Sequence, residues 1–149
     1  MSKSRDRHAR GLRGPMALPN PLTGGPVRIR RRPRPGEFFV TCVGEAVTRI
    51  GRQCPGVLES VEIGIEDVPT LEGAWSRDRV PLAAALEATA DRPSQVIIYR
   101  RPLEHRAASR KGLRILVYRT IVEQLSALTG MPVSEIDPEG LAADDDWGE

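Results

Sequence analysis

The stretch SQVIIYRRPLEHRAASRKGLRILVYRTIVEQLSALTG, residues 94–130, joins the clearest predicted strand of the chain to its clearest predicted helix. Its first part, SQVIIYRR, is rich in β-branched and aromatic side chains, which favour extended backbone. Pro93 and Pro102 bracket this run, so we expect a strand over residues 94–101. Because the apolar residues are contiguous and do not alternate, we expect cover on both faces of this strand.

The helix that follows is predicted from about Ser109 to Leu128, where apolar residues recur every three or four positions. Gly130 stands just after its end, where a helix commonly needs a left-handed residue. A short final turn or helix is expected to start at Pro132. The stripe expected to be buried consists of Leu113, Leu116, Val117, Ile121, Leu125 and Leu128.

Three further segments complete the expected fold. A helix is predicted over Glu37–Arg52, ended by the sequence CPG at 54–56. Alternation of apolar with polar or small residues predicts a half-exposed strand over Val61–Glu66. The run VPLAAALEA, residues 80–88, fits either a strand or one helical turn. The apolar face of the first helix should consist of Phe39, Val43, Ala46, Val47 and Ile50.

Charge divides the chain into a basic arm and an acidic body. Residues 1–34 hold ten Lys/Arg and one acidic residue, a balance of +9, whereas the remainder holds 12 basic and 19 acidic residues, a balance of −7. The Pro/Gly/Arg-rich segment 1–35 lacks apolar periodicity, so we expect a disordered arm. It precedes an α+β domain, residues 36–140, in which a small β-sheet packs against two main helices, and an acidic tail, residues 141–149.

Arginines of the arm are candidates for binding nucleic acid or an acidic protein. The alternative is a tail that serves solubility or folds back on the acidic body. The candidate residues are Arg28, Arg30, Arg31, Arg32 and Arg34.

Composition argues against a membrane or secreted protein. No apolar run approaches the length of a transmembrane helix, and no apolar region follows the basic N-terminus as in a signal peptide. Cys42 and Cys54 lack the spacing of a metal site and are expected to be reduced thiols, Cys42 being buried. These observations predict a cytoplasmic protein with no membrane partner.

Three segments carry a family resemblance: RDRHARGLRGP at 5–15, VIIYRRPLEHRAASR at 96–110, and YRTIVEQLSALTGMPVSEIDP at 118–138. With the pattern between them, they resemble the small zincin-like metallopeptidase family, most of all its actinobacterial branch. The resemblance implies a minimal zincin-like domain over residues 36–140. It also implies an HExxHxxGxxD motif on the second long helix. In that motif two histidines and a third residue bind zinc, and the glutamate takes a proton from the metal-bound water.

With Gly130 as the anchor, the two histidine positions of that motif fall on Glu123 and Ala127. The general-base position falls on Gln124 and the third-ligand position on Val133. Alanine and valine cannot bind a metal, and glutamine cannot act as a base. The resemblance therefore implies a protein with a degenerate motif, no zinc, no cofactor and no peptidase activity, which acts by binding a protein or peptide partner.

Two alternatives remain open. One is a metal-dependent peptidase with a rearranged site, in which His105, Glu104 and Glu123 converge on a metal. The other is a nucleic-acid-associated protein that acts through its basic arm. Of Arg100 and Arg101, also candidate binding residues, we expect one to be exposed and the other to pair with a carboxylate such as Glu123.

Overall fold

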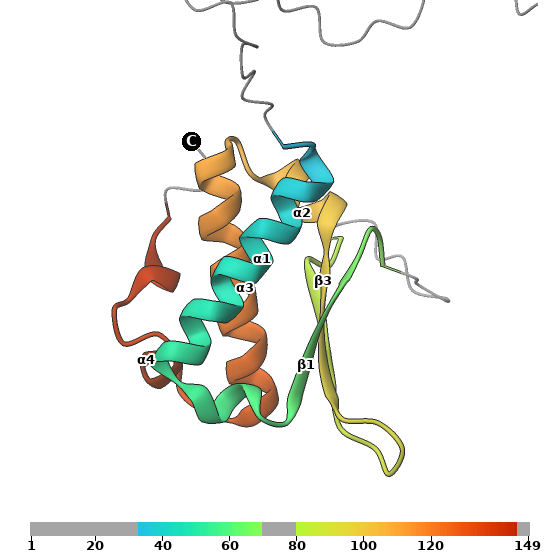
Figure 1. The fold of residues 1–149 in the computed structure, drawn as a ribbon, viewed down its shortest axis with the longest axis vertical. Helices are drawn as coiled ribbons and strands as arrows, with labels where there is room; N and C mark the ends of the chain where they lie inside the picture. The colour runs from blue at the N-terminus through green and yellow to red at the C-terminus, as the bar shows by residue number, and fades with distance from the viewer. Residues whose placement is uncertain (1–32, 70–79, 146–149) are drawn as a thin grey trace, which may run out of the picture. The chain divides into compact units, whose positions relative to one another are not determined.

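The first long helix, α1 (Pro35–Gln53), begins at a proline and buries one face (Figure 1). Proline suits this position because the first N–H groups of a helix have no partner within it. The side chain of Glu37 accepts a hydrogen bond from the backbone N–H of Arg34 at 3.1 Å and stabilises the start of the helix. The predicted helix over Glu37–Arg52 is confirmed, two residues longer at its start. Its buried residues are Phe38, Phe39, Cys42, Val43, Ala46 and Ile50.

The structure is a computed structural model that describes residues 33–69 and 80–145. These residues belong to one compact unit that begins at Pro33. Arg28, Arg30, Arg31 and Arg32 lie outside the described residues. The disordered arm and the domain boundaries therefore stay predictions.

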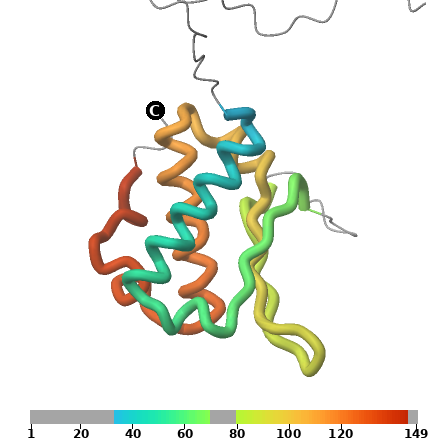
Figure 2. The backbone as a smooth tube through the Cα atoms, in the orientation of Figure 1, coloured from blue at the N-terminus to red at the C-terminus, as the bar shows by residue number. Residues whose placement is uncertain are grey.

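Three strands form the sheet: β1 (Val61–Glu66), β2 (Ala83–Leu86) and β3 (Ser94–Tyr99), in the order β1-β3-β2. β1 runs parallel to β3, and β2 runs antiparallel to it. Figure 2 follows the chain through the β2–β3 hairpin and shows both long helices beside the sheet. The two predicted strands share one sheet, and the segment left open between strand and helix forms the strand β2. The α+β fold class is confirmed.

The central strand β3 is covered unequally on its two faces. Val96 and Ile98 are fully buried in the core that the helices share, whereas Ile97 is partly exposed. In the register, Ile97 lies between Gly64 of β1 and Ala84 of β2, which have small side chains or none. The expected cover on both faces is therefore found in full on one face only: among the described residues, both long helices lie on the face of Val96 and Ile98, and the face of Ile97 is partly exposed.

A short helix, α2 (Arg100–Arg106), follows β3 without a linker. The strand therefore ends at Tyr99, two residues earlier than predicted, and the expected connection is partly helical. Pro102 occupies the first turn of α2, where a missing N–H breaks no intrahelical hydrogen bond. Because Pro102 was taken only as the end of the preceding strand, the sequence did not predict this helix.

The second long helix, α3 (Arg110–Thr129), lies at the centre of the domain and contacts α1, β2, β3, α2, α4 and the short C-terminal turn η2. The Oγ of Ser109 caps it by accepting from the N–H of Gly112 at 2.9 Å. Gly130 ends it at φ 75°, which confirms the predicted left-handed residue. Contact on many sides buries Tyr118, Thr120 and Val122, which lie outside the predicted apolar stripe.

The C-terminal segment folds back along α3 in short turns. It consists of α4 (Val133–Ile136) and the 3₁₀ turn η2 (Leu141–Ala143); another 3₁₀ turn, η1 (Pro55–Leu58), links α1 to β1. The predicted short final helix is thus confirmed as α4. None of the helices in the described part of the chain is long and apolar enough to cross a membrane.

Candidate functional site

The residues at the motif positions lie on the last two turns of α3 and at the start of α4. The side chain of Glu123 is 52% exposed, Ala127 is exposed and Gln124 is partly buried. Val133 follows Gly130 at the first position of α4 and is 39% exposed. We call these four positions the motif face.

Glu123 is held by an arginine one turn earlier on the same helix. The Nε of Arg119 lies 2.9 Å from Oε1 of Glu123, and its Nη1 lies 2.7 Å from Oδ1 of Asp145. The predicted pairing of Glu123 with an arginine therefore occurs, but with the residue four positions away, which is the natural reach on a helix. Arg119 also ties the C-terminal segment to this helix.

The two arginines predicted as partners of Glu123 lie elsewhere. Arg100 pairs with Asp67 at 2.8 Å and with Glu104 at 3.2 Å. Its hydrogen bond and positive charge lower the pKa of Asp67 from its ordinary value. Arg101 is exposed on α2, and its backbone N–H donates to the carbonyl of Asp67. The expectation that one of these arginines is exposed and the other pairs with a carboxylate is therefore confirmed. The example given for that carboxylate, Glu123, is wrong, because Asp67 and Glu104 are the acceptors beside the start of α2.

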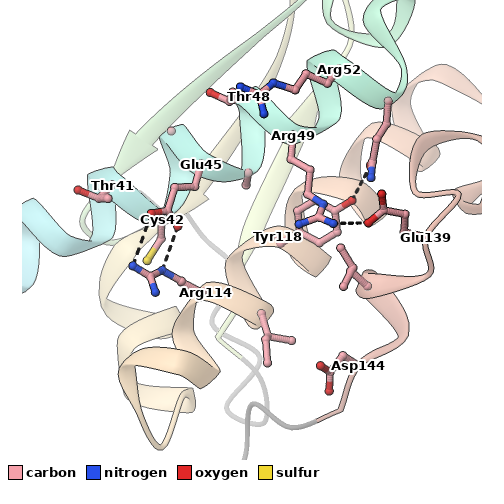
Figure 3. A pocket seen from close by; sticks show the side chains of 15 residues that line it. Thr41, Cys42, Glu45, Thr48, Arg49, Arg52, Arg114, Tyr118, Glu139 and Asp144 are labelled. Atoms are coloured by element: carbon pink, nitrogen blue, oxygen red, sulfur yellow. Dashed lines mark hydrogen bonds and ion pairs between the residues drawn. The ribbon is translucent and has the colours of Figure 1, made fainter.

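A second candidate site lies on another side of α3. It is a groove of about 930 Å³ between α1, α3 and the C-terminal segment, which we call the α1–α3 groove (Figure 3). Arg114 crosses it from α3 to Glu45 on α1, with its Nε 2.9 Å from Oε2. Arg49 pairs with Glu139 and places its guanidinium over the ring of Tyr118. The apolar lining of the α1–α3 groove includes Cys42, Ala46, Ile115 and Leu141.

A buried polar network closes one end of the α1–α3 groove. The hydroxyl of Tyr118 donates to Oδ1 of Asp137 at 2.8 Å and also lies 3.0 Å from Oε1 of Gln53. The other oxygen of Asp137 accepts from the N–H of Ala142 at 2.7 Å, and Asp137 is only 3% exposed. Since a buried carboxylate needs several donors, these contacts fix the C-terminal segment against α3.

Residues 54–147 match the zincin-like metallopeptidase family. The chain belongs to the zincin-like metallopeptidase family. The match covers more than half of the chain and contains β1–β3, α2, α3 and the motif face, and it confirms the family predicted from the sequence. No curated protein sequence matches this chain.

Zincins are expected to hold zinc through side chains on the long helix, but the motif face of this family member does not fit that metal. Glu123 is its one carboxylate and is paired with Arg119. The other three positions offer an amide, a methyl group and an isopropyl group. A zinc site needs about three or four ligands, which are histidine nitrogens, cysteine sulfurs or carboxylate oxygens. The neutral side-chain amide of Gln124 is a poor substitute for any of them.

The rearranged site does not form either. His105 and Glu104 lie on α2, beside the start of α3, and Glu104 pairs with Arg100. Glu123 lies thirteen residues beyond the first residue of α3, which is about 20 Å along the helix axis. Across residues 33–69 and 80–145, no three His, Cys, Asp or Glu side chains gather closely enough to hold a metal ion.

Four ionisable side chains of the α1–α3 groove, Cys42, Tyr118, Glu45 and Glu139, are poorly suited to nucleophilic attack or proton transfer. Burial raises the pKa of the Cys42 thiol to about 11, so it stays protonated and a poor nucleophile. Burial and the hydrogen bond to Asp137 raise the pKa of Tyr118, which keeps its proton. Glu45 and Glu139 are paired with arginines. The groove therefore offers an apolar floor between ion pairs, which suits binding more than proton transfer.

Sequence patterns missed this second site. Tyr118 lies among the apolar residues of α3, but its partners Gln53 and Asp137 are 65 and 19 residues away in the chain. The one local signal was a tyrosine within a buried helix, because a buried phenol usually needs a hydrogen-bond acceptor. Its exact partners follow from tertiary packing.

Proposed function

We propose that this zincin-like metallopeptidase-family protein has lost the zinc-binding HExxH motif, has no peptidase activity and acts by binding a protein or peptide. The proposal rests on the residue types at the four positions of the motif face. Glu123 and Ala127 stand at the histidine positions, Gln124 at the base position and Val133 at the third-ligand position. A metal-activated water needs both the metal ligands and a nearby base, and these side chains provide neither set.

The contacts of Glu123 support the same proposal. A metal ligand must offer a lone pair to the ion, but Oε1 of Glu123 accepts from Arg119 at 2.9 Å. The guanidinium of Arg119 supplies the positive charge that this carboxylate would otherwise share with a metal. The pair lies on the surface, with Glu123 52% exposed, so it leaves no buried charge without a partner.

The α1–α3 groove supports binding as the activity of the domain. Its apolar floor accepts aliphatic side chains, and its rim carries charges of both signs from Arg52, Arg114 and Asp144. Such a mixture suits a peptide segment, whose backbone and side chains offer both kinds of contact.

Metal analysis combined with a peptidase assay tests the proposal. Purified protein, dialysed and then measured by elemental analysis, should hold far less than one zinc per chain. A mixture of fluorogenic peptides with added zinc should be cleaved no faster than in buffer. One zinc per chain that survives dialysis, with cleavage that a chelator abolishes, would overturn the proposal. Loss of that zinc in His105→Ala would instead establish a rearranged site.

A further inference from the structure

The side of α1 that faces away from the core carries few charges for a surface helix. At about 3.6 residues per turn, five exposed residues fall opposite its buried side: Glu37, Thr41, Gly44, Thr48 and Arg52. Val40 lies beside them and is 57% exposed. We call these six residues the outer face of α1. Its two charges stand at its ends and the residues between them are uncharged, whereas the solvent side of a helix usually carries charges along its length.

Within the described part of the chain, the outer face of α1 is open. The helix packs against α3 and η1 through its buried side. Figure 3 shows Thr48 and Arg52 on the side of α1 that is turned away from Tyr118 and Arg114. No atom lies within 4 Å of a Cβ placed at Gly44. Because glycine has no side chain, the backbone of another helix can approach α1 closely at this point.

The outer face of α1 ends in opposite charges. Glu37 lies in the first turn and Arg52 in the last turn, about 22 Å apart along the helix axis. Oε2 of Glu37 accepts from the N–H of Arg34, and the side chain is exposed. Among residues 33–69 and 80–145, the guanidinium of Arg52 has neither an ion pair nor a hydrogen bond. A partner that fits this face therefore offers a cation and a carboxylate at the same separation.

A second copy of α1 has that charge pattern when it runs antiparallel to the first. Residues 37 and 52 share their midpoint with residues 41 and 48, and this midpoint lies next to Gly44. A two-fold axis there places Glu37 of each copy opposite Arg52 of the other copy. It also places Thr41 of each copy opposite Thr48 of the other. Two parallel helices in register would instead bring like charges together.

The charges on the flank of α1 do not oppose this contact, because each is neutralised within its own chain. Oε2 of Glu45, which lies close to the axis, is 2.9 Å from Nε of Arg114. Arg49 pairs with Glu139 in the same way. Two copies that meet at this face therefore bring together ion pairs on the flank and not isolated charges.

We propose that the outer face of α1 is the interface of a two-fold homodimer, in which two α1 helices pack antiparallel across Gly44 and Glu37 pairs with Arg52 at both ends. This inference rests on the proposed function, since it names a second copy of the chain as a protein that the domain binds. The α1 side of the α1–α3 groove includes Thr41, Gly44, Thr48 and Arg52, so the second copy covers that side. Two helices that meet over about 28 Å form a small interface, and the dimer is accordingly weak and dependent on concentration.

Two charge reversals in the full chain, Glu37→Arg and Arg52→Glu, test the predicted ion pairs. A homodimer of either variant brings like charges together at both ends. A mixture of the two variants allows a heterodimer in which opposite charges meet at both ends. Arg92→Glu is the matched control, because it reverses an exposed arginine in the β2–β3 turn and gives the same net charge as Arg52→Glu.

Thermal melts show whether each variant is folded, which matters most for Glu37→Arg, since this change removes the carboxylate that accepts from the N–H of Arg34. If Glu37→Arg does not fold, the comparison of Arg52→Glu with Arg92→Glu still decides the proposal, because neither change touches that cap. In both of these variants a surface arginine becomes a glutamate, so only its position differs.

The measurement is sedimentation velocity at low salt over a hundredfold range of protein concentration. The average mass of the intact protein should rise from 16.4 kDa toward twice that value as the concentration increases. Each charge reversal alone should weaken association by roughly tenfold or more, because two attractive contacts become repulsive. The mixture should associate about as strongly as the intact protein, and so should Arg92→Glu.

Three results would overturn the proposal. One is an intact protein that stays monomeric over the whole range. Another is equal association of Arg52→Glu and Arg92→Glu, which would place any contact between copies elsewhere on the chain. The third is a mixture of folded variants that associates no better than each variant alone. None of these results involves zinc or peptide cleavage, so they are distinct from a failure of the proposed function, which metal analysis and the peptidase assay decide.

Discussion

Two sides of α3 hold their polar residues in opposite ways. On the groove side, Tyr118 is 7% exposed and donates to Asp137, nineteen residues further along the chain. On the motif face, Glu123 is 52% exposed and pairs with Arg119, four residues earlier. Ala127 follows Tyr118 by nine residues, about two and a half helical turns, so the two residues point in opposite directions.

The difference indicates where the fold depends on polar contacts. Long-range contacts on the groove side hold the C-terminal segment in place, and their loss leaves buried groups without partners. The ion pair of Glu123 with Arg119 on the motif face is local and open to water, so its loss should matter little, although Arg119 also pairs with Asp145.

The largest effect is expected from Asp137→Ala. This change removes the acceptor for the buried hydroxyl of Tyr118 and for the N–H of Ala142. We expect the free energy of unfolding to fall by about 3 kcal/mol, since two hydrogen bonds to a buried carboxylate are lost and the N–H of Ala142 loses its acceptor. The hydroxyl of Tyr118 keeps Gln53 as an acceptor. Urea denaturation measures the change.

Glu59→Ala is the control for that variant, because it removes a carboxylate from an exposed position just after η1. It should change the free energy of unfolding by less than about 0.5 kcal/mol. If Asp137→Ala also stays within about 1 kcal/mol of the original protein, the groove side does not hold the fold as the contacts indicate.

Two glycines sharpen the comparison, because one lies next to the motif face and the other lines the α1–α3 groove. Replacing them with alanine should change the free energy of unfolding in opposite directions. Gly130 ends α3 at φ 75°, whereas Gly44 lies within α1 and lines the α1–α3 groove. No atom lies within 4 Å of a Cβ placed at either glycine, so backbone preference alone decides the outcome.

Gly130→Ala should lower the free energy of unfolding by about 1 kcal/mol, because alanine is strained in the left-handed region. Gly44→Ala should raise it by about 0.5–1 kcal/mol, because alanine favours a helix more than glycine does. Thermal melts of the two variants are enough to compare the signs. A stabilising Gly130→Ala would mean that the end of α3 is less well defined than its geometry indicates.

The sequence alone identified β1, β3 and the two long helices, because these depend on local periodicity that β3 and α3 show clearly, whereas it left the segment that forms β2 open between strand and helix. It failed where a contact depends on packing. It missed α2, since Pro102 resembles a boundary until its place in the first turn is known. It named Glu123 as an example of the carboxylate that pairs with Arg100 or Arg101, although Glu123 pairs with Arg119, one helical turn away. It gave no sign of the α1–α3 groove, which two helices and the C-terminal segment form together.

A smaller effect on stability, and a gain of metal binding, is expected from Glu123→His with Gln124→Glu and Ala127→His. This triple variant rebuilds HExxH on exposed or partly buried positions. The free energy of unfolding should change by no more than about 1 kcal/mol, since one surface ion pair is lost. Zinc should bind weakly, because Val133 still stands where a third protein ligand is needed.

Calorimetric titration with zinc, urea denaturation and a peptide-cleavage assay check the triple variant. Gln124→Glu alone is the control, and it should bind no zinc. Two results would count against the assignment of these positions: zinc binding no stronger than in the control, or unfolding of the triple variant. Efficient cleavage would show that Val133 does not prevent catalysis and that the motif face still has the geometry of an active site.

The smallest effect concerns Asp67 and Arg100, a surface ion pair near the end of β1. The hydrogen bond from Arg100, followed by its charge, lowers the pKa of Asp67 from its ordinary 3.8. A carboxyl with a lowered pKa in the folded state stabilises the fold fully above its ordinary pKa. It loses that contribution as the pH falls through the folded pKa. A double-mutant cycle with Asp67→Asn and Arg100→Gln should therefore show a coupling at pH 6 that fades as the pH falls well below 3.8. The coupling should be small, because the side chain of Asp67 is 62% exposed. Urea denaturation at pH 6 and pH 2.5 measures the coupling, and the cycle cancels the separate contact of Arg100 with Glu104.

A coupling of the same size at pH 6 and pH 2.5 would mean that a contact other than the ionised carboxylate joins Asp67 and Arg100. Arg119 and Glu123 offer the same cycle on the motif face, where a coupling as large as that of the groove network would contradict the contrast between the two sides of α3.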